Sequence, residues 1–214
     1  MRRQLQERYK HTDAAREAFW RTLGALDPQT LTPIAGGDEW PGRRQAWRLI
    51  HRPAGSTLLV TDGMSDFDAD SDEPSVGFEL ELALETDEPL GPMAHSWQYQ
   101  VLARVGDEVT GHERLRKWLQ QGMMSMEVSG EDMPPELVTQ EGRVGVLLGI
   151  KPSTLPLSFD MPEGKVRLVT IQVLLPTELE FLLAEGKGGS EEMARRFMAS
   201  GQEHRVRAQR PSVV

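Results

Sequence analysis

Regular alternation of apolar and polar residues is clearest in the segment GFELELALET, residues 77–86. Every second side chain is large and apolar, and the side chains between them are mainly glutamate: Phe78, Leu80, Leu82 and Leu84 against Glu79, Glu81, Ala83 and Glu85. A period of two is typical of a strand whose two faces meet different surroundings. We therefore predict a half-exposed strand of an antiparallel or mixed sheet, with the apolar residues in the core and the glutamates in water.

Short aliphatic and β-branched runs predict further strands along the chain. They are RQAWRLIHR at 44–52, STLLVT at 56–61, MMSMEV at 123–128, VGVLLGI at 144–150 and VRLVTIQVLL at 166–175. The last run is long and apolar enough to lie centrally in a sheet.

Apolar residues near helical spacing predict five helices. The expected helices span about 5–26, 92–106, 111–122, 176–189 and 190–200. Thr177 with Glu180 matches a capping box, and Ser190 is the expected N-cap of the last helix. The stretch LDPQTLTPIAGGDEWPG, residues 26–42, is rich in turn formers and is expected to be irregular.

Helices and strands interleave without strict alternation, which favours the α+β (mixed α/β) class. We predict one central, mostly antiparallel or mixed sheet flanked by helices. A length of 214 residues suits a single domain over residues 1–214, with a basic C-terminal tail at about 203–214.

Composition narrows the classes of function. The net charge of −9 argues against a sequence-independent nucleic-acid binder, which needs a basic face. The absence of cysteine excludes disulfides, thiolate metal sites and cysteine nucleophiles. The first residues do not form a signal peptide, and no apolar run approaches the roughly 20 residues of a membrane helix. We expect a cytoplasmic protein without a cofactor, and neither a nucleic acid nor a membrane as its partner.

The charge is unevenly distributed along the chain. Residues 53–103 contain no lysine or arginine, and eleven acidic residues fall between Asp62 and Glu88. Arginines precede this stretch, and the tail carries Arg205, Arg207 and Arg210. One hypothesis is therefore that the acidic loop at residues 61–74 docks onto the basic tail within the same chain.

The acidic loop also raises two chemical alternatives. Asp68, Asp70, Asp72 and Glu79 have the spacing of calcium ligands, but Glu73 stands where the sharp turn of such a loop needs glycine. A carboxylate-dependent or metal-dependent hydrolase could use the acidic cluster from Asp62 to Asp72. A row of carboxylates in water lacks the burial that raises a catalytic pKa, so the residues themselves favour a solvated loop.

Several motifs in order resemble the suppressor of fused domain family. They are LLVTDGMSD at 58–66, VGFELELAL at 76–84, VRLVTIQVLLPTELEFLLAEG at 166–186 and the terminal RPSVV. The resemblance covers roughly residues 40–214. The chain is similar to a bacterial, single-lobe member of the family, because it is long enough only for the first of the two lobes of eukaryotic members.

The resemblance implies a non-enzymatic protein-binding module. Eukaryotic members hold a transcription factor of the Hedgehog pathway through a short peptide that adds to sheet edges between the lobes. Small bacterial members are regarded as immunity proteins that neutralise a toxin encoded beside them. The leading hypothesis is therefore an immunity-type protein that captures a partner protein, with a toxin or another basic protein as the partner.

The resemblance also implies partner-binding residues. In eukaryotic members an aspartate shortly after the Gly-Leu-Ser-Asp turn pairs with the peptide, and an aromatic residue in the preceding strand assists it. Counted without gaps, these positions fall on Asp70 and on Leu59, where the aromatic residue is missing. With the neighbouring acidic residues Asp66 and Asp68 they form the predicted partner-binding set.

Overall fold

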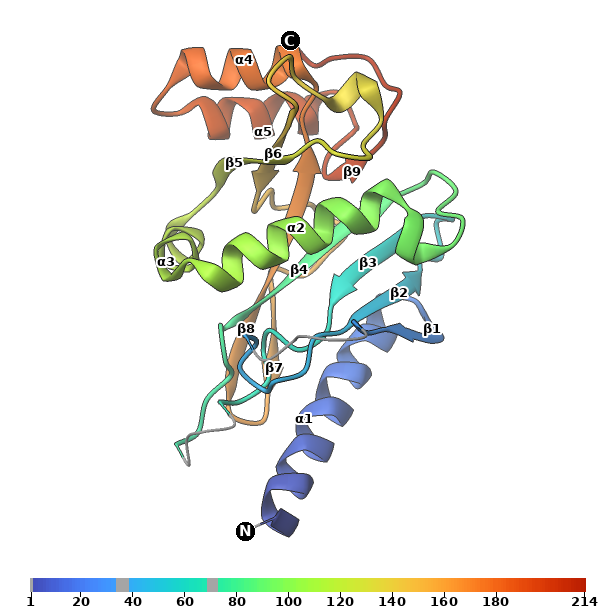
Figure 1. Ribbon diagram of the computed structural model, residues 1–214, viewed down its shortest axis with the longest axis vertical. Helices are drawn as coiled ribbons and strands as arrows, with labels where there is room; N and C mark the ends of the chain where they lie inside the picture. The colour runs from blue at the N-terminus through green and yellow to red at the C-terminus, as the bar shows by residue number, and fades with distance from the viewer. Residues whose placement is uncertain (1, 34–38, 69–72) are drawn as a thin grey trace.

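One mixed β-sheet organises the protein (Figure 1). The computed structural model describes residues 2–33, 39–68 and 73–214. Across the sheet the strands follow the order β1 (Ala25–Leu31), β2 (Trp47–His51), β3 (Thr57–Thr61), β4 (Leu80–Thr86), β8 (Gly164–Val173), β6 (Arg143–Leu148) and β5 (Met124–Ser129). Neighbours in this order pair antiparallel except β4 and β8, which are parallel. The predicted α+β class with a mixed sheet is confirmed.

Helices cover both faces of the sheet. Helix α1 (Arg2–Leu23) lies on one face, and α2 (Trp97–Gly111) crosses the other, where α3 (Glu113–Gln121) follows it (Figure 1). Helices α4 (Pro176–Glu185) and α5 (Gly189–Ala199) pack together at the end of β6, beside the C-terminus. Among the described residues, no helix is both long and apolar enough to cross a bilayer.

Alternate residues of the central strands feed two separate apolar cores. Leu59 and Leu82 lie in the core under α2, together with Val101. Leu58 and Ala83, one position along, lie in the core under α1 with Trp20. Because side chains alternate across a strand, a sheet covered on both faces must bury every residue of its middle strands.

Strand β4 shows the consequence, and it corrects the half-exposed strand predicted from GFELELALET. All seven residues of β4 are buried, including Glu81 and Glu85. The two glutamates point to the face that α1 and the C-terminal tail cover, so the prediction that they lie in water is wrong. Glu79 precedes the strand and is the exposed member of the row, with a φ of 60°.

Element boundaries differ where pairing partners decide them. The first helix ends at Leu23, and β1 (Ala25–Leu31) forms within the stretch expected to be irregular because it pairs with β2. The short strand β7 (Ser158–Met161) was not predicted and forms a hairpin with β8. The N-cap of helix α4 is Leu175, two residues before the predicted Thr177 cap, and Glu178 accepts a hydrogen bond from the backbone of Leu175.

The C-terminal tail docks onto the body of the protein. Its strand β9 (Arg205–Val206) pairs in parallel with the end of β4. Buried His204 contacts Glu85 at 2.7 Å, and Arg207 pairs with Asp87. Arg210 pairs with Glu178 at 2.5 Å, with both side chains buried. The tail therefore docks within the same chain. In the described residues, however, Arg207 and Arg210 pair with Asp87 and Glu178 rather than with the acidic loop.

Arg210 should matter far more to stability than its tail neighbour Arg207. Replacing Arg210 with methionine leaves the buried Glu178 carboxylate without its cation, which typically costs about 3–5 kcal/mol. The matched change Arg207→Met removes a pair that is about one-third exposed and should cost at most about 1 kcal/mol. Urea denaturation of both variants at pH 7 measures the difference. Equal losses would contradict a specific role for the buried pair.

Candidate functional site

The turn at residues 61–66, at the end of β3, is supported by one buried carboxylate. Glu81 on the adjacent strand β4 accepts hydrogen bonds from the backbone N–H groups of Gly63 at 3.1 Å and Ser65 at 2.9 Å. It also accepts from the hydroxyl groups of Ser65 at 2.6 Å and Thr61 at 2.5 Å. Four donors on one fully buried carboxylate define the shape of the turn.

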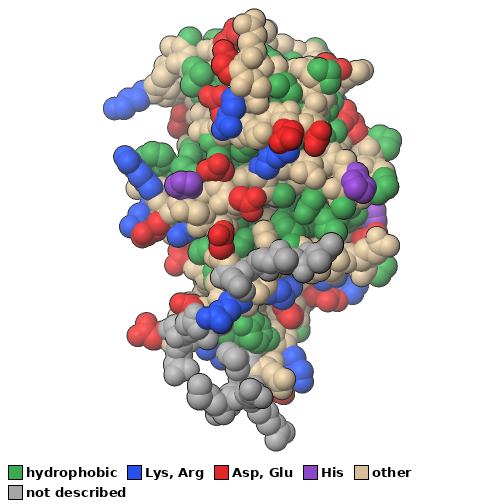
Figure 2. Space-filling view, in the orientation of Figure 1, with side chains coloured by type: hydrophobic (Ala, Val, Ile, Leu, Met, Phe, Trp, Pro, Cys, Tyr) green, Lys and Arg blue, Asp and Glu red, His purple; other side chains and the backbone are tan. Residues whose placement is uncertain are grey.

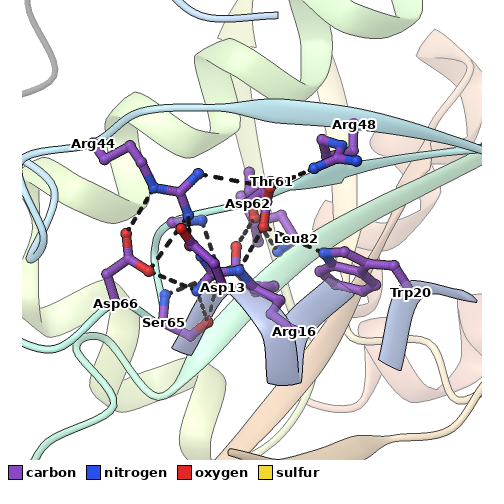
Figure 3. A network of polar contacts seen from close by, with 12 residues as sticks. Asp13, Arg16, Trp20, Arg44, Arg48, Thr61, Asp62, Ser65, Asp66 and Leu82 are labelled. Carbon is purple, nitrogen blue, oxygen red and sulfur yellow. Dashed lines mark hydrogen bonds and ion pairs between the residues drawn. The ribbon is translucent and has the colours of Figure 1, made fainter. Parts of the chain in front are cut away.

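The guanidinium of Arg16, on helix α1, lies beside this carboxylate and contacts the two aspartates of the turn. It is fully buried, and its Nε donates to Asp62 at 2.5 Å. Its Nη1 lies 2.7 Å from the carboxylate of Asp66 and 3.9 Å from that of Glu81. Figure 3 shows the two aspartates converging on Arg16 from both ends of the turn. A buried cation is tolerated in a protein only when charges and hydrogen bonds compensate it in this way.

A second layer of arginines closes the network on its outer side. Arg44, about one-third exposed, donates to Asp66 at 3.2 Å and pairs with Asp13 of α1 at 3.0 Å. Arg48 on β2 lies 3.5 Å from Asp62. The buried acidic residues of the turn are thus surrounded by arginines from α1, β2 and the segment before β2.

Burial and charge act against each other on these groups. Burial raises the pKa of Asp62, but the guanidinium groups of Arg16 and Arg44 outweigh it and hold the pKa below the ordinary value. For Glu81 burial prevails over Arg16 and the hydroxyl donors, and its pKa is raised. Burial lowers the pKa of Arg16, but Asp62, Asp66 and Glu81 more than offset this, so Arg16 stays charged.

Gly77 explains why the two short motifs DGMSD and GFEL occur together. Its φ is 55°, and an added Cβ would lie 2.3 Å from the carbonyl oxygen of Asp66. The chain returns to β4 by passing directly against the turn, where Phe78 N–H donates to the carbonyl of Met64 at 2.9 Å. Only glycine combines this backbone conformation with such a close approach.

A groove of about 390 Å³ opens beside the turn. Its walls come from two segments that flank the network, and they include Trp40, Pro41, Arg43, Asp68, Ser75 and Phe78. Arg116 of α3 stacks over the Phe78 ring at 4.3 Å. Aromatic, proline and charged side chains on a rigid support are suited to contact a protein surface or a peptide.

The predicted partner-binding residues divide between interior and surface. Leu59 is fully buried in the core under α2, and Asp66 is fully buried between Arg16 and Arg44. Neither offers an exposed surface to a partner, because the sheet and the arginines cover them. Asp68 is exposed at the rim of the groove, and Asp70 lies outside the described residues. Contact between this set and a partner stays a prediction.

The described part of the acidic cluster gives little support to a calcium site or to a hydrolase. Asp62 and Asp66 have their carboxylate oxygens engaged by guanidinium groups, so neither is presented to a substrate. Asp70 and Asp72, two of the four calcium-ligand candidates, lie outside the described residues. Within the described ranges, no group of three or more acidic or histidine side chains is arranged to hold a metal ion.

Sequence reasoning missed Arg16 and the buried role of Glu81. Arg16 lies 46 residues from Asp62 in the chain, and no local pattern links the two. The one available signal was an arginine only four residues before Trp20, on the face of the helix that turns to the core.

Comparison with known proteins agrees with this architecture. The family model described as Suppressor of fused protein matches residues 48–211. No curated protein sequence matches the chain. A suppressor of fused homologue from Neisseria gonorrhoeae has a similar structure, with a TM-score of 0.59 and 14% sequence identity over 98% of both chains.

Two structures of the eukaryotic proteins are also similar. Suppressor of fused from Drosophila has a TM-score of 0.56 at 16% identity, over 87% of this chain and 47% of its own. A chain of the Sufu–Fu complex has a TM-score of 0.50 at 14% identity, over 87% of this chain and 85% of its own. At such identities the likeness concerns the fold.

The buried cation should dominate the stability of the turn. Arg16→Met leaves three carboxylates without their central cation and is expected to cost about 3–5 kcal/mol in unfolding free energy. Arg21→Met on the same helix removes only an exposed pair with Glu17 and should cost less than about 0.5 kcal/mol. Chemical denaturation at pH 7 distinguishes the two. Similar losses would show that the network is not what Arg16 stabilises.

Asp62 should make stability depend on acid pH. Its pKa in the folded protein is below the unfolded value of about 3.9, so its ionised form stabilises the fold above that pH. This contribution is lost as pH falls through the folded pKa. The difference in unfolding free energy between wild type and Asp62→Asn should therefore shrink between pH 5 and pH 2. The pKa of Glu81 shifts in the opposite direction, with burial as the largest cause and Asp62 as a smaller one, so only the part due to Asp62 enters the difference. A difference that stays constant with pH would refute this assignment.

Proposed function

We propose that this chain, which belongs to the suppressor of fused protein family, is a non-enzymatic protein-binding module that captures a partner through the face beside the 61–66 turn. The observation that carries the proposal is the groove next to the turn, supported by a network of charges whose centre, Arg16 with Asp66 and Glu81, is fully buried. A surface that is held this firmly loses little conformational entropy when a partner binds.

Family membership supports protein binding as the activity. One similar structure is a complex of Sufu with Fu, so that relative holds another protein. The fully engaged carboxylates of Asp62 and Asp66 also favour a structural role for the turn over a hydrolytic one. We therefore prefer binding to the carboxylate-dependent or metal-dependent hydrolase.

For the partner we propose a basic protein, and for the biological role an immunity-type protein that neutralises a toxin. The chain carries a net charge of −9, which favours encounter with a basic partner. Asp68 and Asp70 are the proposed contacts, with Asp68 at the groove rim. Leu59 and Asp66 contribute indirectly, because they support the strand and the turn that lead to those contacts.

Affinity capture from the native host tests the proposal. The variant Asp68→Lys/Asp70→Lys should bind a partner that the wild type enriches about five- to thirtyfold more weakly, because two charge reversals at a rim are worth about 1–2 kcal/mol. The difference should shrink in 0.5 M salt. Growth rescue on co-expression with the captured protein would support the immunity role.

The matched control is Glu131→Lys/Glu191→Lys, which makes the same change in net charge at exposed positions away from the groove. It should capture the partner like wild type. If Asp68→Lys/Asp70→Lys captures as much of the partner as the wild type does, the groove face is refuted as the binding surface. A captured protein without toxicity would refute the immunity role alone.

A further inference from the structure

A second hollow lies beside the part of β8 that pairs with neither β6 nor β7. Strand β6 pairs with β8 at residues 171–173, and β7 pairs with it at residues 164–167. Between these two pairings the edge of β8 borders a notch of about 280 Å³. The loop after β6 forms one wall and the start of β7 forms the other, so the notch is built on the central sheet.

The notch is basic although the chain is acidic. Lys151, Lys165 and Arg167 line it, and none of the described residues that line it is acidic. Two of the five lysines in the whole chain are thus placed at one hollow. On the face that Figure 2 shows, by contrast, acidic and basic side chains are interspersed.

These cations are weakly compensated within the described chain. Lys165 lies 3.8 Å from Asp160, but both side chains are at least two-thirds exposed, so water screens the pair. Arg167 donates through Nη1 to the backbone carbonyl of Leu119, a neutral acceptor. Arg16 and Arg44 near the turn, by comparison, meet carboxylates directly.

An apolar side chain stands beside the cations. Leu157 is 49% exposed, one of five large apolar side chains that the described residues leave open. Behind it, Ile150 and Leu168 are buried and close the floor of the notch. A small inorganic anion would satisfy the lysines and leave Leu157 in water. A peptide with carboxylates and an aliphatic side chain would satisfy both.

We propose that this notch is a docking site for an acidic segment of a partner protein. Carboxylates of the segment pair with Lys151 and Lys165, and an aliphatic side chain covers Leu157. Because the net charge of the protein repels an acidic segment elsewhere, the notch also decides where that segment lands. The notch shares no lining residue with the groove beside the turn, so it binds independently of the proposed function.

The test uses a defined probe with purified full-length protein. A fluorescein-labelled 12-residue peptide, eight glutamates with four leucines, is titrated by fluorescence anisotropy in 50 mM salt. We expect saturable binding that Lys151→Glu/Lys165→Glu weakens by about tenfold or more, since the two reversals turn two attractions into repulsions. Leu157→Ser should weaken binding about threefold to tenfold, and this loss should persist in 0.5 M salt.

The control Lys10→Glu/Lys187→Glu reverses two exposed lysines outside the notch and should change affinity less than twofold. Equal weakening by both double variants would show non-specific attraction and overturn the proposal. Absence of saturable binding would also overturn it. If tripolyphosphate displaces the peptide and Leu157→Ser has no effect, the notch binds anions only, which overturns the assignment of a peptide.

Discussion

The structure depends on one buried guanidinium. Arg16 brings together three parts of the chain that are distant in sequence: helix α1, the turn after β3, and the strand β4. A charge removed from water must be compensated by nearby opposite charges and hydrogen bonds, so all three parts have to be in place at once. Helix α1 is therefore a structural element of the turn and more than a cover for one sheet face.

The need to compensate buried charges separates the acidic residues into two classes with different roles. Those in the interior shape the turn: Asp62 and Asp66 are already paired with arginines, and Glu81 accepts hydrogen bonds from the turn itself. Those at the surface, such as Asp68, contribute to the field that a partner meets. A formal net charge of −9 is the sum of both, and only the second class can steer association.

The C-terminal tail obeys the same rule at another place. Glu178 is buried at the start of α4 and receives Arg210, while Glu85 is buried at the end of β4 and receives His204. Both carboxylates lie on elements that the sequence predicts as a helix or a strand. Both pair with a side chain of the C-terminal tail. The tail thus completes the polar interior in a way that resembles the role of α1.

Local patterns predicted most of the elements. The period of two in residues 77–86 predicted β4, and helical spacing predicted α1, α2, α3 and the two last helices. Edge strands β1 and β7 escaped prediction because their own residues carry turn formers, and pairing with β2 and β8 is what makes them strands. For the candidate site, the motifs located the turn and Asp68, but they placed Leu59 and Asp66 at a surface.

The sequence by itself determined most of the elements, the class of the fold and the two motifs that meet at the turn, because these follow from spacing and from backbone needs such as the left-handed Gly77. Only the tertiary structure decided which polar residues are buried. Alternation shows that Leu82 and Glu81 lie on opposite faces of a strand. It does not show whether the face that carries Glu81 is covered by water or by a helix. Here it meets α1 and Arg16, and Glu81, one of a row of glutamates that looks like a solvated face, supports the turn from the interior.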